Sequence, residues 1–383
     1  MDSAEREGLS PKGNVPNLRF PEFQGEWSVT TLQKDCIVNP TNEKIADKFV
    51  YVDLESVKQG QLYKYQILTK DNAPSRAQRV LHTDDILFQC VRPYQMNNYM
   101  VKGTMSDIQW VASTGYAQIR TQTDYPAFLY YVLNTSKYNK AVMVRCTGSS
   151  YPAINSEDLS KIPFYKCGIA EQKKIADFLF LLDERIATQN KIIEDLKKLK
   201  SAIRKKMFSL LKDEYTESFE INQLLDYEQP TAYIVANDEY STDTSLTPVL
   251  TANKGFILGY TDEKFGIYQK GECIIFDDFT MDAKYVSFPF KVKSSAIKIL
   301  TAKPNVNLRF MFEYLSYWEL KSEGHKRHYI SEIASLVIEL PSKERQSIIA
   351  SLMTSLNSKL DIEAKTKIRY EEQKRYLLSQ MFI

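Results

Sequence analysis

Two long segments free of glycine and proline constrain this chain more than any other feature. They are EQKKIADFLFLLDERIATQNKIIEDLKKLKSAIRKKMF, residues 171–208, and RQSIIASLMTSLNSKLDIEAKTKIRYEEQKRYLLSQMF, residues 345–382. The segments align without a gap, because Gln172 and Gln346 are 174 positions apart and the Met-Phe pairs near the segment ends keep the same spacing. Such an internal repeat predicts two copies of one structural unit.

Apolar side chains recur at steps of three, four and seven in both segments, which places them on one stripe of an α-helix. In the first segment the stripe consists of Ile175, Phe178, Leu179, Leu182, Ile186, Ile193, Leu196, Ile203 and Met207. In the second it consists of Ile349, Leu352, Leu356, Leu360, Tyr370, Leu377 and Met381, with a polar middle. Each helix would be about 57 Å long, and its narrow stripe needs a partner helix. The sequence therefore predicts a coiled-coil pair.

Length and composition indicate a soluble protein of two or three domains. The chain has 383 residues, 43% of them hydrophobic and 26% charged, and this is an ordinary globular composition. It has no apolar run of about 18 residues, and its polar N-terminus does not resemble a signal peptide. The net charge of +2 favours no class of partner, and a pI of about 8.0 counts mildly against a dedicated nucleic-acid binder. Five widely spaced cysteines without a C-x-x-C predict buried thiols of a cytoplasmic protein.

Short β-rich runs alternate with turns before each long helix. In the first half these runs are DILFQCV, YMVKGTM and YAQIRT, and residues 125–138 predict a helix that begins at Pro126. The second half repeats the order with CIIFDDF, SSAIKILT, the helical LRFMFEYLSYW and then YISEIASLVIELP. The predicted parts are a tail and proline-containing leader (1–26), an α/β domain (27–165), a central helix (171–212), a second α/β domain (215–340) and a C-terminal helix (343–383).

Motifs of several enzyme classes are missing from the sequence. It contains no phosphate-binding G-x-x-x-x-G-K-[ST] loop, no dinucleotide-binding G-x-G-x-x-G, and no [DN]-P-P-[YFW] tetrapeptide of the amino-methyltransferases. Three histidines leave a Ser/His/Asp or zinc hydrolase short of partners. Ser295 to Lys298 matches S-x-x-K but lies in a predicted strand without companion motifs. We therefore predict no catalytic residue, metal site or cofactor in this chain.

Polar, basic and aromatic loops lie at matching places in the two α/β domains. Arginine and lysine attract phosphates, and the amides of asparagine and glutamine can pair with adenine edges, so these loops predict DNA contacts. The candidates in the first domain are Lys70, Arg76, Arg79, Arg92, Gln95, Asn97, Asn98, Lys102, Arg145, Ser149, Ser150 and Tyr151. Those in the second are Asn253, Lys254, Lys284, Lys326, Arg327 and His328. For any one residue a solvated surface role is the alternative, and the hypothesis rests on the grouping.

The end of the first long helix is basic. We take Gln172, Lys197, Lys198, Arg204 and Lys205 as candidate contacts to a partner subunit. Two alternatives stay open for the cations, because they would also complement the helix dipole at a C-terminus or receive DNA.

Several motifs occur together and in one order. They are N-V-P-N-L-R-F-P-E-F followed by G-x-W, then T-G-S-S-Y-P-A-I-N, then E-Q-K-K-I-A-D-F-L, and then L-D-E-R-I ending in K-K-M-F. With these motifs the chain, over residues 14–382, resembles the specificity subunit of type I restriction-modification enzymes. The helix start E-Q-x-K-I-x-x-F-L is the most specific of them. The second half departs from the pattern, since residues 344–346 read E-R-Q and Asn357 replaces the Asp of L-D.

This resemblance implies an α+β fold in which two mixed α/β target recognition domains are separated by a long antiparallel two-helix coiled coil, as an internal pseudo-repeat. It implies a non-catalytic subunit that binds double-stranded DNA with a bipartite asymmetric site. The implied partners are two modification subunits, which carry S-adenosylmethionine and methylate adenine, with two motor-nuclease restriction subunits able to join. The alternative is a coiled-coil assembly or regulatory protein whose α/β domains bind protein or carbohydrate. A self-sufficient nuclease or methyltransferase is disfavoured by the missing motifs.

Overall fold

The computed structural model describes residues 13–41, 43–103, 108–211, 217–251, 255–318 and 329–383. The chain divides into two compact units, Met1–Thr188 with Lys367–Ile383, and Gln189–Thr366. Each unit therefore contains one α/β domain and a part of both long helices. Among the described helices, none is long and apolar enough to cross a membrane.

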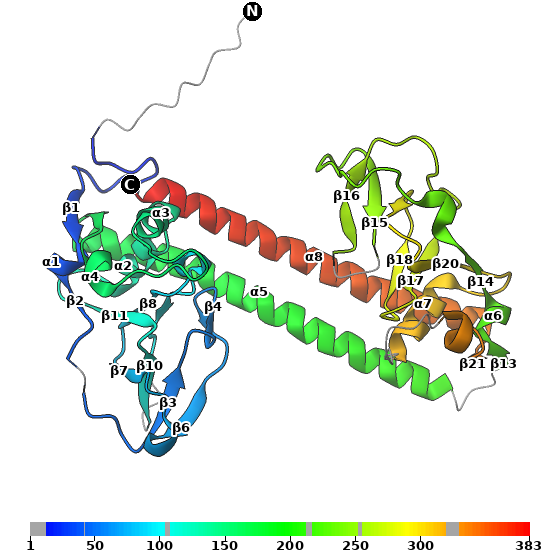
Figure 1. The fold of residues 1–383 in the computed structure, drawn as a ribbon, viewed down its shortest axis with the longest axis horizontal. Coiled ribbons are helices and arrows are strands. Elements are labelled where there is room, and N and C mark those ends of the chain that lie inside the picture. Colours follow the sequence, from blue (N-terminus) through cyan, green and yellow to red (C-terminus); the bar gives the residue numbers. More distant parts are fainter. Residues whose placement is uncertain (1–12, 42, 104–107, 212–216, 252–254, 319–328) are drawn as a thin grey trace, which may run out of the picture. The chain divides into compact units, whose positions relative to one another are not determined.

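Two four-stranded sheets form most of the first α/β domain (Figure 1). Its elements are β1 (Ser28–Thr31), α1 (Leu32–Asp35), β2 (Cys36–Val38), β3 (Lys48–Val52), β4 (Val57–Lys58), β5 (Gln61–Leu62), β6 (Gln66–Thr69), η1 (Lys70–Asn72), β7 (Ala77–Leu81), β8 (Ile86–Gln89), η2 (Pro93–Gln95), β9 (Tyr99–Met100), β10 (Gln109–Ser113), β11 (Tyr116–Thr121), α2 (Pro126–Leu133), α3 (Ser136–Val144), α4 (Ser156–Ser160) and β12 (Pro163–Lys166). The strand orders are β2-β11-β8-β9 and β6-β3-β10-β7. Within these sheets only β3 and β10 run parallel.

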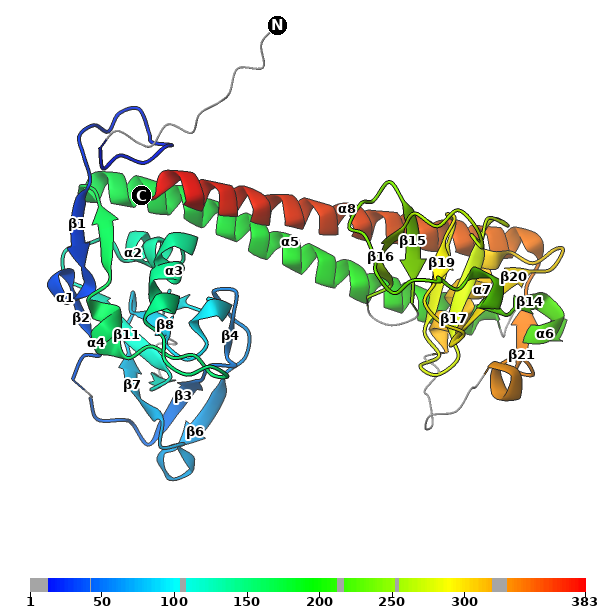
Figure 2. The same ribbon diagram turned by 45° about the horizontal axis from the view of Figure 1, so that its top comes forward.

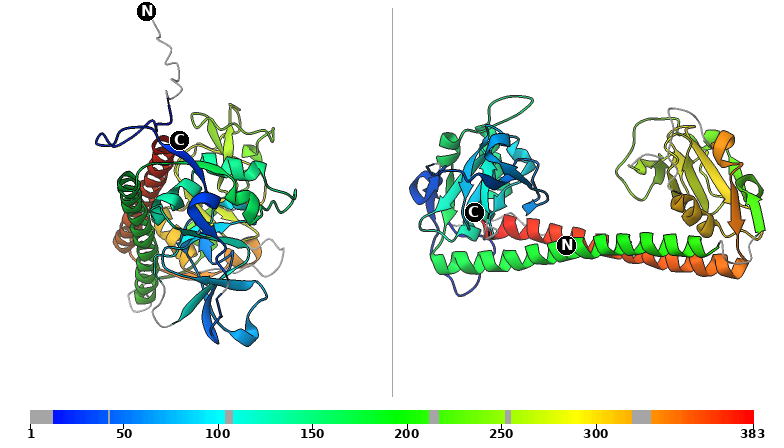
Figure 3. Two further views of the ribbon diagram at one scale, coloured as in Figure 1. Left: turned by 90° about the vertical axis from the view of Figure 1, so that its left-hand side faces the viewer. Right: turned by 90° about the horizontal axis from the view of Figure 1, so that it is seen from below.

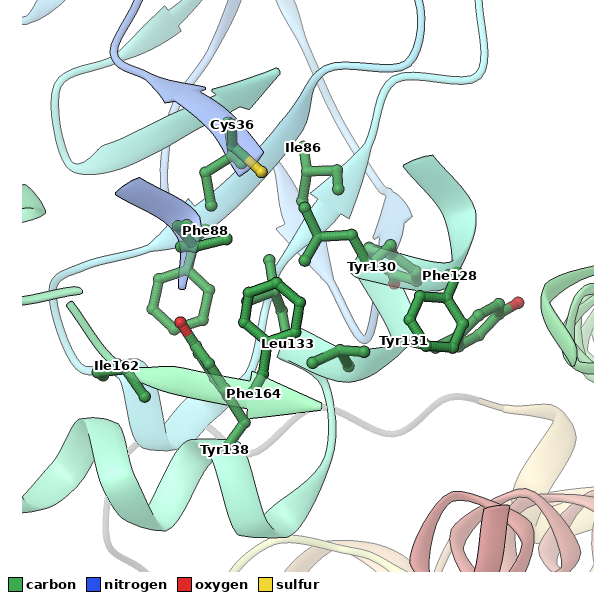
Figure 4. Close-up of a cluster of buried hydrophobic side chains, with 14 of the residues drawn as sticks. Cys36, Ile86, Phe88, Phe128, Tyr130, Tyr131, Leu133, Tyr138, Ile162 and Phe164 are labelled. Atoms are coloured by element: carbon green, nitrogen blue, oxygen red, sulfur yellow. The ribbon is translucent and has the colours of Figure 1, made fainter. Parts of the chain in front are cut away.

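The core of the first domain lies between the β2-β11-β8-β9 sheet and the helices α2 and α3. Figure 4 shows Phe88 of β8, Phe128 and Leu133 of α2, and Tyr138 of α3 in one cluster, and all four are buried. Strand β8 reads ILFQ and is buried on both faces, and α2 is buried from Phe128 to Leu133. Apolar residues on every side are typical of elements enclosed by the rest of a domain.

The second α/β domain repeats this plan. Its elements are β13 (Glu217–Glu220), α6 (Ile221–Leu224), β14 (Leu225–Glu228), η4 (Pro230–Tyr233), β15 (Thr247–Leu250), β16 (Ile257–Thr261), β17 (Cys273–Asp277), β18 (Ala283–Val286), β19 (Lys291–Val292), β20 (Ile297–Ala302), α7 (Leu308–Tyr317), the π-helical turn η5 (Tyr329–Ile333) and β21 (Val337–Leu340). The order β14-β20-β17-β18 repeats β2-β11-β8-β9, and the parallel pair β15-β19 repeats β3-β10. The predicted pseudo-repeat is confirmed.

One predicted helix is wrong in its length. Residues 125–138 contain the whole of α2 and the start of α3, with a break at Asn134 and Thr135. Thr135 has extended backbone angles and caps α3, because its Oγ1 accepts the N–H of Tyr138 at 3.2 Å. Threonine competes in this way for backbone hydrogen bonds and favours a helix start over a helix interior.

Two long helices, α5 (Ile169–Leu210) and α8 (Lys343–Met381), are present as predicted. The predicted stripe residues are buried or half-buried except Phe178 and Leu352, which are both 40% exposed. These two residues are 174 positions apart, so the prediction is wrong at the same place in each copy. The Phe178 ring lies beside the seam and meets Phe20 of the leader edge-on, with 5.8 Å between ring centroids.

The two helices run in opposite directions within each unit (Figures 1 and 2). In the second unit Gln189 Nε2 donates to the backbone oxygen of Glu363 at 3.1 Å, and further along α5 the side chain of Phe208 shares a buried cluster with Ile349. Residues further along α5 therefore contact residues earlier in α8, as expected for an antiparallel pair. In the first unit the C-terminal end of α8 lies beside the beginning of α5 (Figure 3).

A buried glutamine attaches the start of each long helix to its domain. Gln172 and Gln346 are 2% and 1% exposed. Their Oε1 atoms accept the N–H groups of Tyr125 and Asn307, both at 2.8 Å, and these are the residues that begin α2 and α7. Each Nε2 donates to the carbonyl five residues earlier, at 2.9 Å. The repeat thus conserves an attachment point between two helices of each unit.

A phenylalanine attaches the end of the other long helix to the same domain helix. Phe382 packs on Phe128 of α2 with 5.5 Å between ring centroids, and Phe208 packs on Phe310 of α7 at 5.6 Å. Phe208 also stacks on Tyr317 at 5.1 Å. Each domain is therefore held by the beginning of one long helix and the end of the other.

A carboxylate beside the long helices belongs to a different helix in each unit, half-buried as Asp183 in the first and buried as Glu313 in the second. In the first, Asp183 of α5 accepts the Tyr131 hydroxyl at 2.8 Å and the Lys374 ammonium at 2.5 Å. Burial raises the pKa of Tyr131, so its hydroxyl keeps the proton that it donates. In the second unit the residue that repeats Asp183 is Asn357, and it donates to Glu313 of α7 at 3.1 Å. The carboxylate is thus on the long helix α5 in the first unit and on the domain helix α7 in the second.

The cysteines are free thiols. Cys36, Cys90 and Cys273 are buried, while Cys146 and Cys167 are half-buried. Burial raises the pKa of Cys36 to about 12 and that of Cys90 to about 11, so both remain protonated at neutral pH. The prediction of buried thiols is therefore confirmed for Cys36, Cys90 and Cys273, whereas Cys146 and Cys167 are only half-buried.

The relocated acid predicts a coupled pair of mutations. Asn357→Asp should destabilise the second unit by about 1–3 kcal/mol, because it sets a second carboxylate against buried Glu313. Adding Glu313→Gln should recover most of that loss, since one acid then remains for Arg204. Thermal unfolding of the full chain, with hydrogen exchange of the α7 amides, measures both effects. Losses that simply add in the double variant would contradict the pairing.

Candidate nucleic-acid interface

Two of the predicted loops of the first domain are joined by backbone hydrogen bonds. The N–H of Arg92 donates to Pro152 O at 2.8 Å, and Ala153 forms bridges with both Val91 and Thr147. The η2 loop and the 145–153 loop therefore form one surface. Ser149, Ser150 and Tyr151 are exposed on it.

The third predicted loop reaches the same surface through the turn between β10 and β11. The N–H of Thr114 donates to Arg76 O at 2.9 Å, and the N–H of Cys90 donates to Gly115 O at 3.0 Å. The turn thus lies between Arg76 and the start of the η2 loop. We call this edge the loop rim and define it as residues 76–79, 91–97, 113–116 and 145–153.

Only some of the predicted basic residues are accessible on the loop rim. Arg76 and Arg145 are exposed, although Arg145 donates to Ala141 O of its own helix at 2.9 Å. Arg79 is half-buried and its Nε donates to Tyr116 O at 2.9 Å, and burial lowers its pKa. Lys70 is exposed but begins η1 outside the rim.

Most of the predicted amide residues form hydrogen bonds within the domain that hold the loop rim together. Gln89 is 2% exposed; it donates its N–H to Asn98 Oδ1 and its Nε2 to Gln95 Oε1, both at 2.9 Å. Asn97 Oδ1 accepts the N–H of Gln59 at 3.1 Å. Asn98 is 1% exposed and its amide is enclosed, and its contact with DNA stays a prediction. Gln95 remains exposed.

Lys102 faces the long helix instead of the rim. Its ammonium lies 4.3 Å from the ring centroid of Phe180 on α5, and burial lowers its pKa. Lys102 also lines a small cavity with Tyr130, Tyr131 and Asp183. Lys102 connects the domain to α5 but is exposed, so its contact with DNA stays a prediction.

The second domain offers fewer described candidates. Lys284 is half-buried on β18 and pairs with Ile275 of β17. Asn253, Lys254, Lys326, Arg327 and His328 lie outside the described residues. Next to them Tyr329 donates its N–H to Asp278 Oδ1 at 2.8 Å, and the ammonium of Lys298 lies 3.6 Å from Asp278 Oδ2. The β17-β18 turn is therefore tied to the segment that begins at Tyr329.

The predicted partner contacts separate into two groups. Gln172 is enclosed at the helix start, and Arg204 Nη2 donates to Glu313 at 2.7 Å, so both serve inside their own units. Lys197, Lys198 and Lys205 are exposed on α5. Only these three are available to a partner subunit in this conformation.

Sequence reasoning missed an exposed hairpin beside the rim. Lys58 of β4 holds its ammonium 4.5 Å from the ring centroid of Tyr63, which is 69% exposed. The hydrogen bond between Gln59 and Asn97 sets this hairpin next to the η2 loop. The alternation of basic and aromatic residues in VKQGQLYKY was the available signal. Across the described part of the chain, no three acidic, His or Cys residues gather closely enough to hold a metal ion.

Comparison with known families gives the chain a context. Two segments, residues 36–198 and 214–372, match the family described as type I restriction modification DNA specificity domain. The chain is 39% identical over 178 residues to the specificity subunit of the type I restriction enzymes EcoR124I and EcoR124II of Escherichia coli, and the match spans 42% of this chain and 43% of that subunit. Less than half of the Escherichia coli subunit is therefore matched. The putative type I restriction enzyme MjaX specificity subunit of Methanocaldococcus jannaschii is 23% identical over 412 residues, which span 98% of this chain and 89% of that protein.

Solved structures share the fold. The type I restriction-modification S subunit from M. genitalium superposes with a TM-score of 0.66 at 16% identity, covering 96% of this chain and 99% of that one. A chain from a study of complex assembly and conformational transition of the type I R-M system gives 0.56 at 18% identity, covering 93% and 97%. Two family matches over most of the chain, on a fold with two repeated domains and two long helices, show that this protein belongs to the type I restriction-modification specificity family and carries its DNA specificity domain twice.

Proposed function

We propose that this chain is the sequence-specific DNA-binding subunit of a type I restriction-modification complex, and that each α/β domain recognises one half of a bipartite asymmetric site. The observation that carries this proposal is the pairing of one repeated frame with two different sets of loops. Gln172 and Gln346 attach the domains in the same way, whereas the loop residues differ, as in R-C-T-G-S-S-Y at 145–151 and G-H-K-R-H at 324–328. A shared frame with different loops suits two different half-sites.

Helix length supports a split site. Helix α5 has 42 residues and runs from one unit into the other. A helix of this length is about 63 Å long and corresponds to at most about 18 base pairs at roughly 3.4 Å each, so two domains attached near its ends would leave unread pairs between their half-sites. The long helices would then determine the spacing.

The outer faces of the long helices would receive the partner subunits. Lys197, Lys198 and Lys205 are exposed there, and so are Leu181 at 60% and Leu199 at 49%. Apolar side chains that a helix leaves in solvent favour a partner surface. We assign this surface to two modification subunits that carry S-adenosylmethionine and methylate adenine, with restriction subunits able to join. The chain itself would be non-catalytic and would work on DNA in the cytoplasm.

Reconstitution tests the function directly. Co-expression of the chain with modification subunits should produce adenine methylation at one bipartite motif, detected by methylome sequencing, and the chain alone should produce none. Complexes that bind protein or carbohydrate but methylate no bipartite motif would support the alternative assembly role.

Domain replacement tests the assignment of half-sites. Exchange of residues 27–165 for the corresponding domain of another family member should change one half of the methylated motif and leave the other half and the spacing intact. An exchange that alters both halves, or neither, would contradict independent domains. Exchange of residues 215–340 is the matched control and should change the opposite half.

Lengthening the helices tests their role in spacing. Insertion of four residues after Asn190, matched by four after Glu363, keeps the antiparallel partners in register because Gln189 and Glu363 face each other. The added turn of about 6 Å should widen the spacer by roughly two base pairs without changing either half-site. Methylome sequencing reads the spacer, and replacement of four residues at each place without a change in length is the control. An unchanged spacer would exclude the helices as the determinant.

A further inference from the structure

Arg92 is held in an uncommon backbone conformation on the loop rim. Its φ of 55° lies in the left-handed region, and Pro93 follows it, which already disfavours the α region for Arg92. Its N–H donates to Pro152 O at 2.8 Å and its carbonyl accepts the N–H of Gln95 at 3.0 Å. A non-glycine residue in this region is strained, and such residues concentrate at functional sites.

The side chain of Arg92 is ordered by stacking. Its guanidinium carbon lies 4.4 Å from the ring centroid of Tyr151, and that ring is 63% exposed. A guanidinium that lies on an aromatic face keeps its N–H donors at its edges, where they can still form hydrogen bonds. The stack therefore limits the rotation of the side chain without occupying its donors.

Several other stacked cations of the chain already have an acidic partner, although Lys58, Lys102 and Lys137 do not among the described contacts. Arg309 lies 4.1 Å from the Tyr285 centroid, and its Nη2 is 3.4 Å from Glu272. Lys374 lies over Tyr131 and pairs with Asp183, Lys291 over Phe265 with Glu263, and Lys270 over Tyr233 with Glu228. Those stacks serve the packing of their own units.

The Arg92 guanidinium differs from these cations. Within the described ranges it makes no hydrogen bond or ion pair, and its charge and donors are left for a ligand. Around it the exposed Tyr94, at 51%, and Gln95 form the rest of the η2 loop surface. A preoriented pair of parallel donors fits two acceptors in one plane. In DNA the major-groove edge of guanine presents such a pair as O6 and N7, and arginine is its commonest partner.

We infer that Arg92 reads a guanine in the half-site bound by the first domain, with Tyr151 as the positioning residue that orients the guanidinium. This inference rests on the proposed function. A phosphate also presents two oxygens to an arginine, but it carries no sequence information. The two roles therefore predict different effects on the methylated motif.

The test uses the complete methyltransferase complex and methylome sequencing. Arg92→Ala should relax one guanine position in one half-site, with a loss of discrimination of roughly 10- to 100-fold, and leave the other half-site and the spacing unchanged. Arg92→Lys should lose much of the same discrimination while it keeps overall DNA binding, because lysine cannot form the bidentate contact. Tyr151→Phe keeps the ring and should keep the motif, whereas Tyr151→Ala should relax the same position as Arg92→Ala.

Controls separate this inference from folding and from the proposed function. Arg309→Ala removes a stacked arginine that already pairs with Glu272 and should leave the motif unchanged. Thermal unfolding of the Arg92 and Tyr151 variants should match the parent. If the alanine variants unfold, Arg92→Lys keeps the charge and Tyr151→Phe keeps the ring. A uniform weakening on all sequences, restored by Arg92→Lys, would assign a phosphate contact and overturn the inference. A half-site without guanine, or a motif unchanged in Arg92→Ala, would also overturn it while the bipartite motif persists. If the parent complex methylates no bipartite motif, the proposed function fails instead.

Discussion

Each α/β domain depends on two attachments that come from different parts of the chain. In the first unit Gln172, near the beginning of α5, accepts a hydrogen bond from the residue that caps α2. Phe382, after the end of α8, packs on Phe128 of α2. Loss of the hydrogen-bond partner of this buried amide would lower the free energy of unfolding by about 1–3 kcal/mol. The glutamine therefore stabilises the domain and also fixes the direction of α2 relative to α5. Since both attachments act on α2, the domain orientation is tied to the antiparallel pairing of the two helices within that unit.

The large-scale organisation follows from sequence patterns because it rests on periodicity. The 174-residue offset, the two long helices and the order of strands and helices all depend on spacing along the chain, and the structure agrees with them. The predicted stripe is wrong at Phe178 and Leu352, which lie three residues after the buried Ile175 and Ile349. In each helix the residue four positions on, Leu179 or Met353, is the one that is buried. The break at Thr135 escaped the pattern because one side-chain cap, and not hydrophobicity, ends the helix.

The candidate site was predictable as a set of loops but not residue by residue. Arg92 and Arg79 look alike in sequence, yet one guanidinium stacks on an exposed ring and the other donates to Tyr116 O. Asn98 looks as suitable for base contact as Gln95, yet the Gln89 network encloses it. Such differences arise from contacts between strands that are distant in sequence. The hairpin with Lys58 was missed for the same reason, because only the fold brings it next to the η2 loop.

The position of the carboxylate beside the long helices has a consequence for how such chains diversify. A domain taken from the second position would carry Glu313. In the first position this carboxylate would meet Asp183, whose ion-pair partner is Lys374 of α8. A domain taken from the first position would bring a hydroxyl to Asn357 and leave Arg204 without its acid. The two domain positions therefore differ in which helix supplies the carboxylate. Recombination between unrelated chains would preserve folding most readily when it replaces like with like, first domain for first and second for second.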